Sequence, residues 1–147
     1  MHARPLTVAY IDVDDLKPVN DRYGHGVGDT LLRVVAESIR VRVRKSDVVA
    51  RLGGDEFALL LPEAGYEAAE AAVRKIHASL VQVMHNRGWR VTFSIGVVTC
   101  ISPPDTTLEE LIRVADGLMY SVKRSGKNQI RHETLGLPAP RDKERLA

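Results

Sequence analysis

Two acidic residues follow a pair of glycines near the middle of the chain, in the run Arg51-Leu52-Gly53-Gly54-Asp55-Glu56-Phe57. Glycine adopts positive φ angles readily, so the chain can reverse direction at the diglycine within two residues. The apolar stretches on either side, 48–52 and 57–61, predict the two strands of a hairpin. Carboxylates are poor strand and core residues, so Asp55 and Glu56 beside this turn suggest cation or phosphate chemistry, although an ordinary hairpin with solvated acids would be the default if the match stood alone.

A second group of carboxylates lies upstream, where an apolar run from Leu6 ends at Asp12 and is followed by Asp14 and Asp15. Such a run is typical of a central strand that is buried on both faces. Mg²⁺ prefers oxygen ligands and is commonly held by one or two carboxylates together with substrate phosphates. We therefore expect Asp12 and Asp55 to share a magnesium site, whereas Asp14 or Asp15 alone fits an acidic residue capping the next helix.

The helices and strands that must position these acids are predicted from the spacing of apolar residues and from the glycines and prolines that end each element. Apolar residues at helical spacing predict helices over 29–44 and 66–86, and Gly88 is expected to stop the second. Thr107-x-x-Glu110 is a capping box for a third helix, which Gly126 ends. Further predicted elements are a helical turn at 18–23, a strand over 90–99 broken by Pro103-Pro104, and an edge strand at 128–131. This order predicts a mainly antiparallel sheet with helices on its faces.

Composition indicates a single intracellular domain. The 147 residues are enough for one hydrophobic core, and a net charge of +2 with 27% charged residues argues against nucleic-acid or membrane-surface binding. The single cysteine, Cys100, excludes an intrachain disulfide and favours a reducing compartment. The sequence shows neither a membrane span nor a secretory signal. We expect residues 133–147, with prolines and mixed charges, to form a flexible tail.

Short motifs occur in a fixed order along residues 6 to 131. They are Asp12-x-Asp14-x-x-Lys17, Asn20-Asp21-x-x-Gly24-His25-x-x-Gly28-Asp29, Arg51-x-Gly53-Gly54-Asp55-Glu56-Phe57, Ser94-Ile95-Gly96-Val97, Ala115-Asp116-x-x-Met119-Tyr120-x-x-Lys123 and Ser125-Gly126-Lys127-Asn128. Each motif alone recurs by chance, but the ordered set is highly specific. In this set the chain resembles the GGDEF family, the diguanylate cyclases of bacterial signalling.

The resemblance implies an α+β fold, a ferredoxin-like palm similar to class III nucleotide cyclases and polymerase palms. It implies a catalytic domain over 1–132, in a protein of the bacterial cytoplasm that normally carries an attached sensory or receiver domain. The helix that usually precedes the first strand in the family is absent from this chain. Two further departures are Leu16, where the family more often has Phe, and Lys127, where Arg is frequent.

The resemblance also implies a reaction in which two GTP molecules form cyclic di-GMP and release two pyrophosphates. Asp12, Asp55 and the carbonyl of Val13 match the family's ligands for two Mg²⁺ ions, for which Mn²⁺ can substitute. Asp55 also matches the residue assigned as the base for the 3′-hydroxyl, although a metal-bound hydroxide remains an alternative. Glu56 is a second candidate for catalysis or for the metal. Because the product holds two equivalent nucleotides, a homodimer with two-fold symmetry is expected.

Other matching positions would recognise the substrate. Asn20 and Asp29 match the family's guanine-reading pair, and a carboxylate at Asp29 can accept the N1 and N2 hydrogens that adenine lacks. His25 matches a residue lining this pocket, with a loop histidine bonded to nearby backbone as the alternative. The triphosphate charge would be neutralised by lysines at three matching positions, Lys17, Lys123 and Lys127.

A second nucleotide site is indicated by Arg44-Lys45-Ser46-Asp47. Arg can bond the O6 and N7 atoms of guanine in bidentate fashion, and Asp can meet the opposite edge. In the family, an Arg-x-x-Asp pair at this distance from the diglycine marks an inhibitory site for the product. The alternative is a solvated basic surface, because Arg40 and Arg42 are close in sequence.

Three other functions compete with a diguanylate cyclase. One is a catalytically silent receptor that binds cyclic di-GMP through Arg44 and Asp47. Another is a regulatory GTP-binding module, and the third is a cyclase that forms adenylate or mixed products. The complete set of acids at Asp12, Asp55 and Glu56 opposes the silent receptor, and Asp29 opposes the adenylate cyclase.

Overall fold

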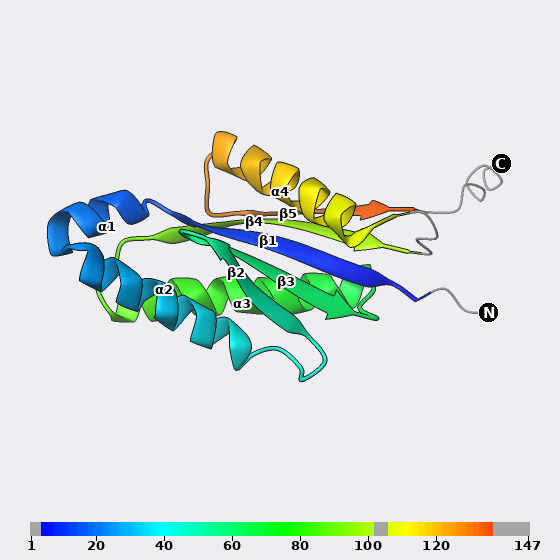
Figure 1. The fold of residues 1–147 in the computed structure, drawn as a ribbon, viewed down its shortest axis with the longest axis horizontal. Helices are drawn as coiled ribbons and strands as arrows, with labels where there is room; N and C mark the ends of the chain where they lie inside the picture. Colours follow the sequence, from blue (N-terminus) through cyan, green and yellow to red (C-terminus); the bar gives the residue numbers. More distant parts are fainter. Residues whose placement is uncertain (1–3, 102–105, 137–147) are drawn as a thin grey trace.

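The computed structural model describes residues 4–101 and 106–136, and Pro103-Pro104 lie outside them. One sheet in the order β2-β3-β1-β4-β5 organises the chain (Figure 1). Its strands are β1 (Leu6–Asp14), β2 (Val48–Gly53), β3 (Glu56–Pro62), β4 (Thr92–Cys100) and β5 (Ile130–Leu135). The helices are α1 (Leu16–Tyr23), α2 (His25–Arg40), α3 (Tyr66–Asn86) and α4 (Leu108–Arg124). Within the described residues, no helix is long and apolar enough to cross a membrane.

Strand β1 lies at the centre of the sheet and determines where the acidic residues meet. It pairs antiparallel with both β3 and β4, and only the β4–β5 pair is parallel, which confirms the mainly antiparallel α+β fold. In this register Asp12 lies opposite Glu56 on β3 and opposite Ser94 on β4. The β2–β3 hairpin therefore brings its acidic turn beside the end of β1.

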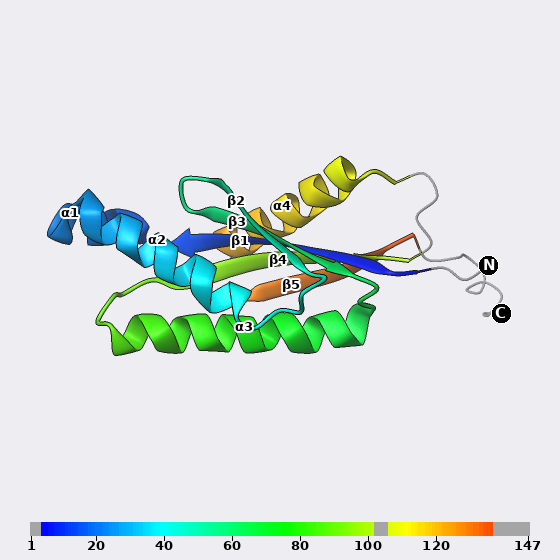
Figure 2. The same cartoon turned by 60° about the horizontal axis from the view of Figure 1, so that its bottom comes forward.

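Helices cover both faces of the sheet, with α2 and α3 on one side and α4 on the other (Figures 1 and 2). Side chains alternate between the faces along a strand. Ala9 and Ile11 of β1 accordingly join the core cluster that contains the buried residues of α2 and α3, whereas Val8 and Tyr10 join the cluster beneath α4. Asp12, two residues beyond Tyr10, lies on the α4 side by the same alternation.

The structure confirms several predicted elements and shifts others. Helix α3 spans the predicted residues 66–86, and Thr107 and Glu110 form the predicted capping box of α4. The helix predicted over 29–44 is wrong at both ends, since α2 runs from His25 to Arg40. The helix starts earlier than predicted because Gly24, with a φ of 92°, ends α1 and caps the start of α2. The second helix therefore begins at the next residue.

The last strand extends beyond the boundary at residue 132 that the sequence analysis set for the domain. Strand β5 continues to Leu135 and pairs with β4, so residues 133–135 belong to the sheet and not to a tail. His132 anchors this strand, because its ring nitrogens lie 2.7 Å from the Thr99 hydroxyl and 2.7 Å from the Glu70 carboxylate. Residues 137–147, the rest of the predicted tail, lie outside the described residues.

Candidate metal and nucleotide site

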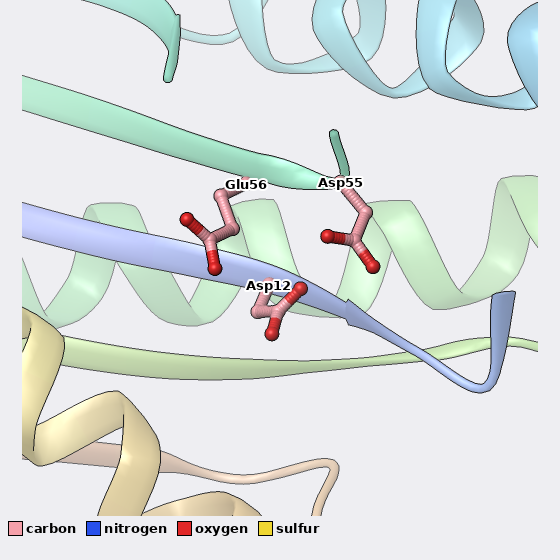
Figure 3. Close-up of side chains that lie close together, drawn as sticks. All are labelled: Asp12, Asp55 and Glu56. Atoms are coloured by element: carbon pink, nitrogen blue, oxygen red, sulfur yellow. The ribbon is translucent and has the colours of Figure 1, made fainter. Parts of the chain in front are cut away.

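Three carboxylates converge where β1 meets the β2–β3 hairpin. Asp12, Asp55 and Glu56 each offer an oxygen, and these oxygens lie within 4.8 Å of one another. Figure 3 shows Asp12 below the two hairpin acids, with the three side chains turned toward one another. The main-chain N–H of Val13 donates to the Asp55 carbonyl at 3.2 Å and so ties the end of β1 to the turn. The predicted approach of Asp12 and Asp55 is thus confirmed.

The cluster carries more negative charge than its surroundings balance. Burial raises the pKa of Asp12 to about 6, and the charges of Asp55 and Glu56 add to this effect, although the ammonium of Lys123 opposes it. The Oδ1 atom of Asp12 is buried without a hydrogen-bond partner in the described part of the chain. A buried polar atom without a partner is rare and costly. Three oxygen donors around such an atom fit a hard divalent cation.

Lys123 of α4 is the cation that the structure places at this cluster. Its Nζ atom lies 3.1 Å from Asp12 Oδ2 and 3.0 Å from Asp14 Oδ1. Burial alone would lower the pKa of Lys123, but its bonds to the two carboxylates outweigh burial and raise the pKa. Lys123 therefore stays charged beside the acids.

Asp14 is completely buried at the end of β1 and is not the helix cap that the sequence analysis allowed. Its carboxylate accepts bonds from the Thr92 hydroxyl at 2.8 Å, the Ser94 hydroxyl at 2.8 Å and the Asn128 main-chain N–H at 3.2 Å. Burial would raise the pKa of Asp14, but these hydroxyls and Lys123 outweigh it and lower the pKa. Asp14 thus joins β1, β4, α4 and the loop after α4.

Lys127 lies in the loop after α4, next to Asn128, whose main-chain N–H donates to Asp14. Its Nζ atom lies 2.9 Å from Oδ1 of Asp15, which occupies the cap position of α1 without making a side-chain capping bond. Lys127 and Asn128 both have positive φ angles, of 66° and 55°. Lys17, the third predicted phosphate-binding lysine, is exposed on α1, and its Nζ atom pairs with Asp21 on the same helix at 2.9 Å.

The predicted guanine-reading residues lie around the junction of α1 and α2. The Oδ1 atom of Asn20 is buried and lacks a hydrogen-bond partner within the described residues. It packs against Gly28 so closely that a Cβ atom on Gly28 would lie 1.8 Å from it, which explains why glycine is required there. Asp29 follows Gly28, and both Asp29 and His25 are exposed on α2.

Arg44 and Asp47 form a separate site on the loop between α2 and β2. The Asp47 carboxylate accepts the Arg44 main-chain N–H at 2.7 Å and its guanidinium at 3.2 Å, and the guanidinium also donates to the Pro62 carbonyl at 2.9 Å. A pocket of about 250 Å³ opens beside the pair, between this loop and α3. The structure therefore brings the predicted Arg-x-x-Asp pair together.

Sequence reasoning missed the roles of two residues beside the acid cluster. Tyr10 donates to Glu56, and Asp14 binds Lys123. A signal for Tyr10 was available, since residues two apart on a strand share a face and Tyr10 precedes Asp12 by two. The same alternation places Asp14 on the face of Asp12, but its bonds from β4 and from the loop after α4 could not be predicted from the sequence.

Known proteins share both the sequence and the architecture of this chain. The profile of the family described as "Diguanylate cyclase, GGDEF domain" matches residues 1–129. Diguanylate cyclase DosC of Escherichia coli K12 is 37% identical over 130 residues, which cover 86% of this chain and 28% of that protein. The chain thus spans little more than a quarter of the length of this relative.

Among solved structures, the GGDEF domain of DgcB from Caulobacter crescentus in complex with c-di-GMP matches with a TM-score of 0.76 and 27% identity, over 88% of this chain and 78% of that one. The GGDEF domain of PA1120 from Pseudomonas aeruginosa matches with a TM-score of 0.72 and 36% identity, over 90% and 84% of the two chains. Both matches cover most of this chain, so both structures share its overall fold.

Proposed function

The chain belongs to the GGDEF family of diguanylate cyclase domains, and on this basis we propose that it condenses two GTP molecules into cyclic di-GMP with release of two pyrophosphates. The observation that carries the proposal is the convergence of Asp12, Asp55 and Glu56 around a buried oxygen that lacks a partner in the described residues. A silent receptor would not need this arrangement. As in the family, the domain would work together with an attached sensory or receiver domain, and the relative DosC is several times longer than this chain.

Asp12, Asp55 and the main-chain carbonyl of Val13 would hold two Mg²⁺ ions, or Mn²⁺ in their place, with Glu56 as a further ligand. When bound, two such ions stabilise the attacking and the leaving oxygens of an in-line displacement. The acids would help to position the 3′-hydroxyl of one GTP, and the Asp55 carboxylate would accept its proton.

Guanine would be read at the junction of α1 and α2. The Asn20 Oδ1 atom is buried without a partner in the described residues, the Asp29 carboxylate is exposed nearby in sequence, and guanine presents the N1 and N2 hydrogens as donors to such acceptors. Adenine would leave these acceptors unpaired, so GTP is favoured over ATP. His25, at the exposed start of α2, would line the same pocket.

The triphosphate would be neutralised by Lys17, Lys123 and Lys127. Lys123 is already held beside Asp12 at 3.1 Å, so a phosphate oxygen bound there meets a charged donor. Lys17 and Lys127 are bound to exposed acids, and such pairs are weak enough to exchange for phosphate. Because one chain offers one nucleotide pocket, the reaction requires two copies that face each other across a two-fold axis.

The test is incubation of the protein with GTP and Mg²⁺, followed by chromatography of the products. We expect cyclic di-GMP from the parent and none from an Asp55→Ala variant, whose exposed turn leaves the core unchanged. ATP should yield no cyclic product. Binding of cyclic di-GMP by a parent that forms no product at any protein concentration would instead identify a receptor.

The Arg44 and Asp47 pair would bind the product and inhibit the enzyme. Arg44→Ala removes the guanidinium that faces the pocket, so we expect at least about a tenfold loss of affinity for cyclic di-GMP, since charged hydrogen bonds contribute roughly 1.5–3 kcal/mol. Calorimetry measures this loss, and product inhibition in the assay should weaken in parallel. Arg40→Ala, a change on the adjacent helix, is the matched control. Unchanged affinity in Arg44→Ala would reject the assignment.

A further inference from the structure

Tyr10 lies beneath the acid cluster and contacts one of its members. Its hydroxyl donates a hydrogen bond to Glu56 Oε1 at 2.7 Å. Among the described residues, Tyr10 is the donor to the Glu56 carboxylate. The Tyr10 side chain is buried in the core cluster under α4, with 8% of its surface exposed. Burial and the bond to Glu56 both raise the pKa of Tyr10, so its hydroxyl keeps the proton that it donates.

Glu56 lies between other negative charges. Asp12 and Asp55 are within 4.8 Å of it on one side. On the α4 side, burial raises the pKa of Asp116, and the charge of Glu56 raises it further. Like charges repel, so electrostatics alone would turn the Glu56 carboxylate outward to solvent. The bond from Tyr10 opposes this repulsion.

We propose that Tyr10 is a positioning residue that holds the Glu56 carboxylate toward the cation site formed with Asp12 and Asp55. Figure 3 shows the geometry, in which one Glu56 oxygen points toward Asp12 and the other points away from it. A bond to one oxygen restrains the other as well, because both oxygens are attached to the same carbon. This inference rests on the proposed function, since it assumes that the three acids bind metal.

The change Tyr10→Phe isolates the hydroxyl, because phenylalanine keeps the ring in the core beneath α4. Binding of Mn²⁺ by electron paramagnetic resonance, in the presence of 3′-deoxyguanosine triphosphate, measures the site without turnover. We expect Tyr10→Phe to weaken Mn²⁺ binding about tenfold, from the usual contribution of a charged hydrogen bond. Thermal unfolding of the metal-free variant should change little, because the relieved repulsion offsets the lost bond.

A double-mutant cycle separates positioning from a general structural role. With Glu56→Ala already present, Tyr10→Phe should change Mn²⁺ affinity by less than about twofold, since coupled residues are not additive. Tyr120→Phe is the control, because Tyr120 is 59% exposed on α4. If the parent and Tyr10→Phe bind Mn²⁺ equally well, the positioning role of Tyr10 is wrong. The same holds if Tyr10→Phe has its full effect in the Glu56→Ala background. Either result would leave the metal site itself in place. Failure of the parent to bind Mn²⁺ would overturn the metal site and this inference together.

Discussion

Asp12→Asn is expected to abolish the formation of cyclic di-GMP while making the fold more stable. Metal ions at such sites contribute several kcal/mol to transition-state stabilisation, so the loss of a central ligand should reduce the rate on the order of 10³-fold or more. Asparagine has nearly the shape of aspartate and keeps one carbonyl oxygen, so the packing around β1 is retained. Product chromatography measures the loss.

The gain in stability follows from the pKa of Asp12. Its folded-state pKa of about 6 lies above the ordinary value of 3.8, so the folded chain binds this proton more tightly than the unfolded chain does. The stability that this provides is fully present below pH ~4 and is lost as the pH rises through about 6. At pH 8 in a chelator, Asp12→Asn should therefore be about 1–2 kcal/mol more stable than the parent, and at pH 4 the two should converge.

Unfolding in urea across this pH range measures the difference. The same linkage predicts that Mg²⁺ affinity decreases as the pH falls through about 6, because the proton on Asp12 competes with the metal. Asp116→Asn, which lies outside the predicted ligand set, is the control for a general effect of removing an acid. An Asp12→Asn variant that still forms product at the parental rate would contradict the site.

Asp14→Asn is expected to destabilise the fold by ~3–5 kcal/mol, the usual effect of breaking a buried ion pair. Asp14 is fully buried and accepts bonds from two hydroxyls, a main-chain N–H and Lys123. An asparagine offers one acceptor and directs two N–H donors at groups that are themselves donors. The lowered pKa of Asp14 means that its contribution is present above pH ~4 and is lost as the pH falls.

Asp15→Asn is the matched control, because it makes the same chemical change one residue along the chain. Asp15 has one exposed partner, Lys127, and exposed pairs contribute about 0–1 kcal/mol. Asparagine also tolerates the left-handed backbone of Asp15, whose φ is 64°. Urea unfolding gives the two free energies, and hydrogen exchange at the Asn128 amide reports whether the loop after α4 is released. Similar effects of the two substitutions would contradict the role of Asp14.

Sequence reasoning succeeded where the physical cause is local. The apolar residues on either side of the diglycine predict two strands, so the position of Asp55 in the hairpin could be predicted, although neither Gly53 nor Gly54 adopts the positive φ that the prediction invoked. The apolar run that ends at Asp12 identified a buried central strand for the same reason. Helix α3 was predicted at both ends because its apolar spacing is uninterrupted and Gly88 adopts a φ of 75° after it.

Tertiary structure decided the roles of neighbouring residues with the same chemistry. Asp14 and Asp15 are adjacent and identical in type, yet one is buried and the other is exposed, because the strand ends between them. Lys123 reaches the acid cluster, whereas Lys17 pairs with an exposed acid on its own helix. Local sequence contains no information that separates these cases.

The sequence by itself determined which acids exist, that Asp12 lies near the end of a buried strand and Asp55 in a hairpin turn, and therefore that a cation site was to be expected between them. Only the tertiary structure decided that Asp14 supports this site, since its donors lie 78 residues away at Thr92 and 114 residues away at Asn128. The reason is physical. A strand or a turn follows from interactions among a few successive residues, whereas the burial and charge of a carboxylate depend on every segment that packs against it.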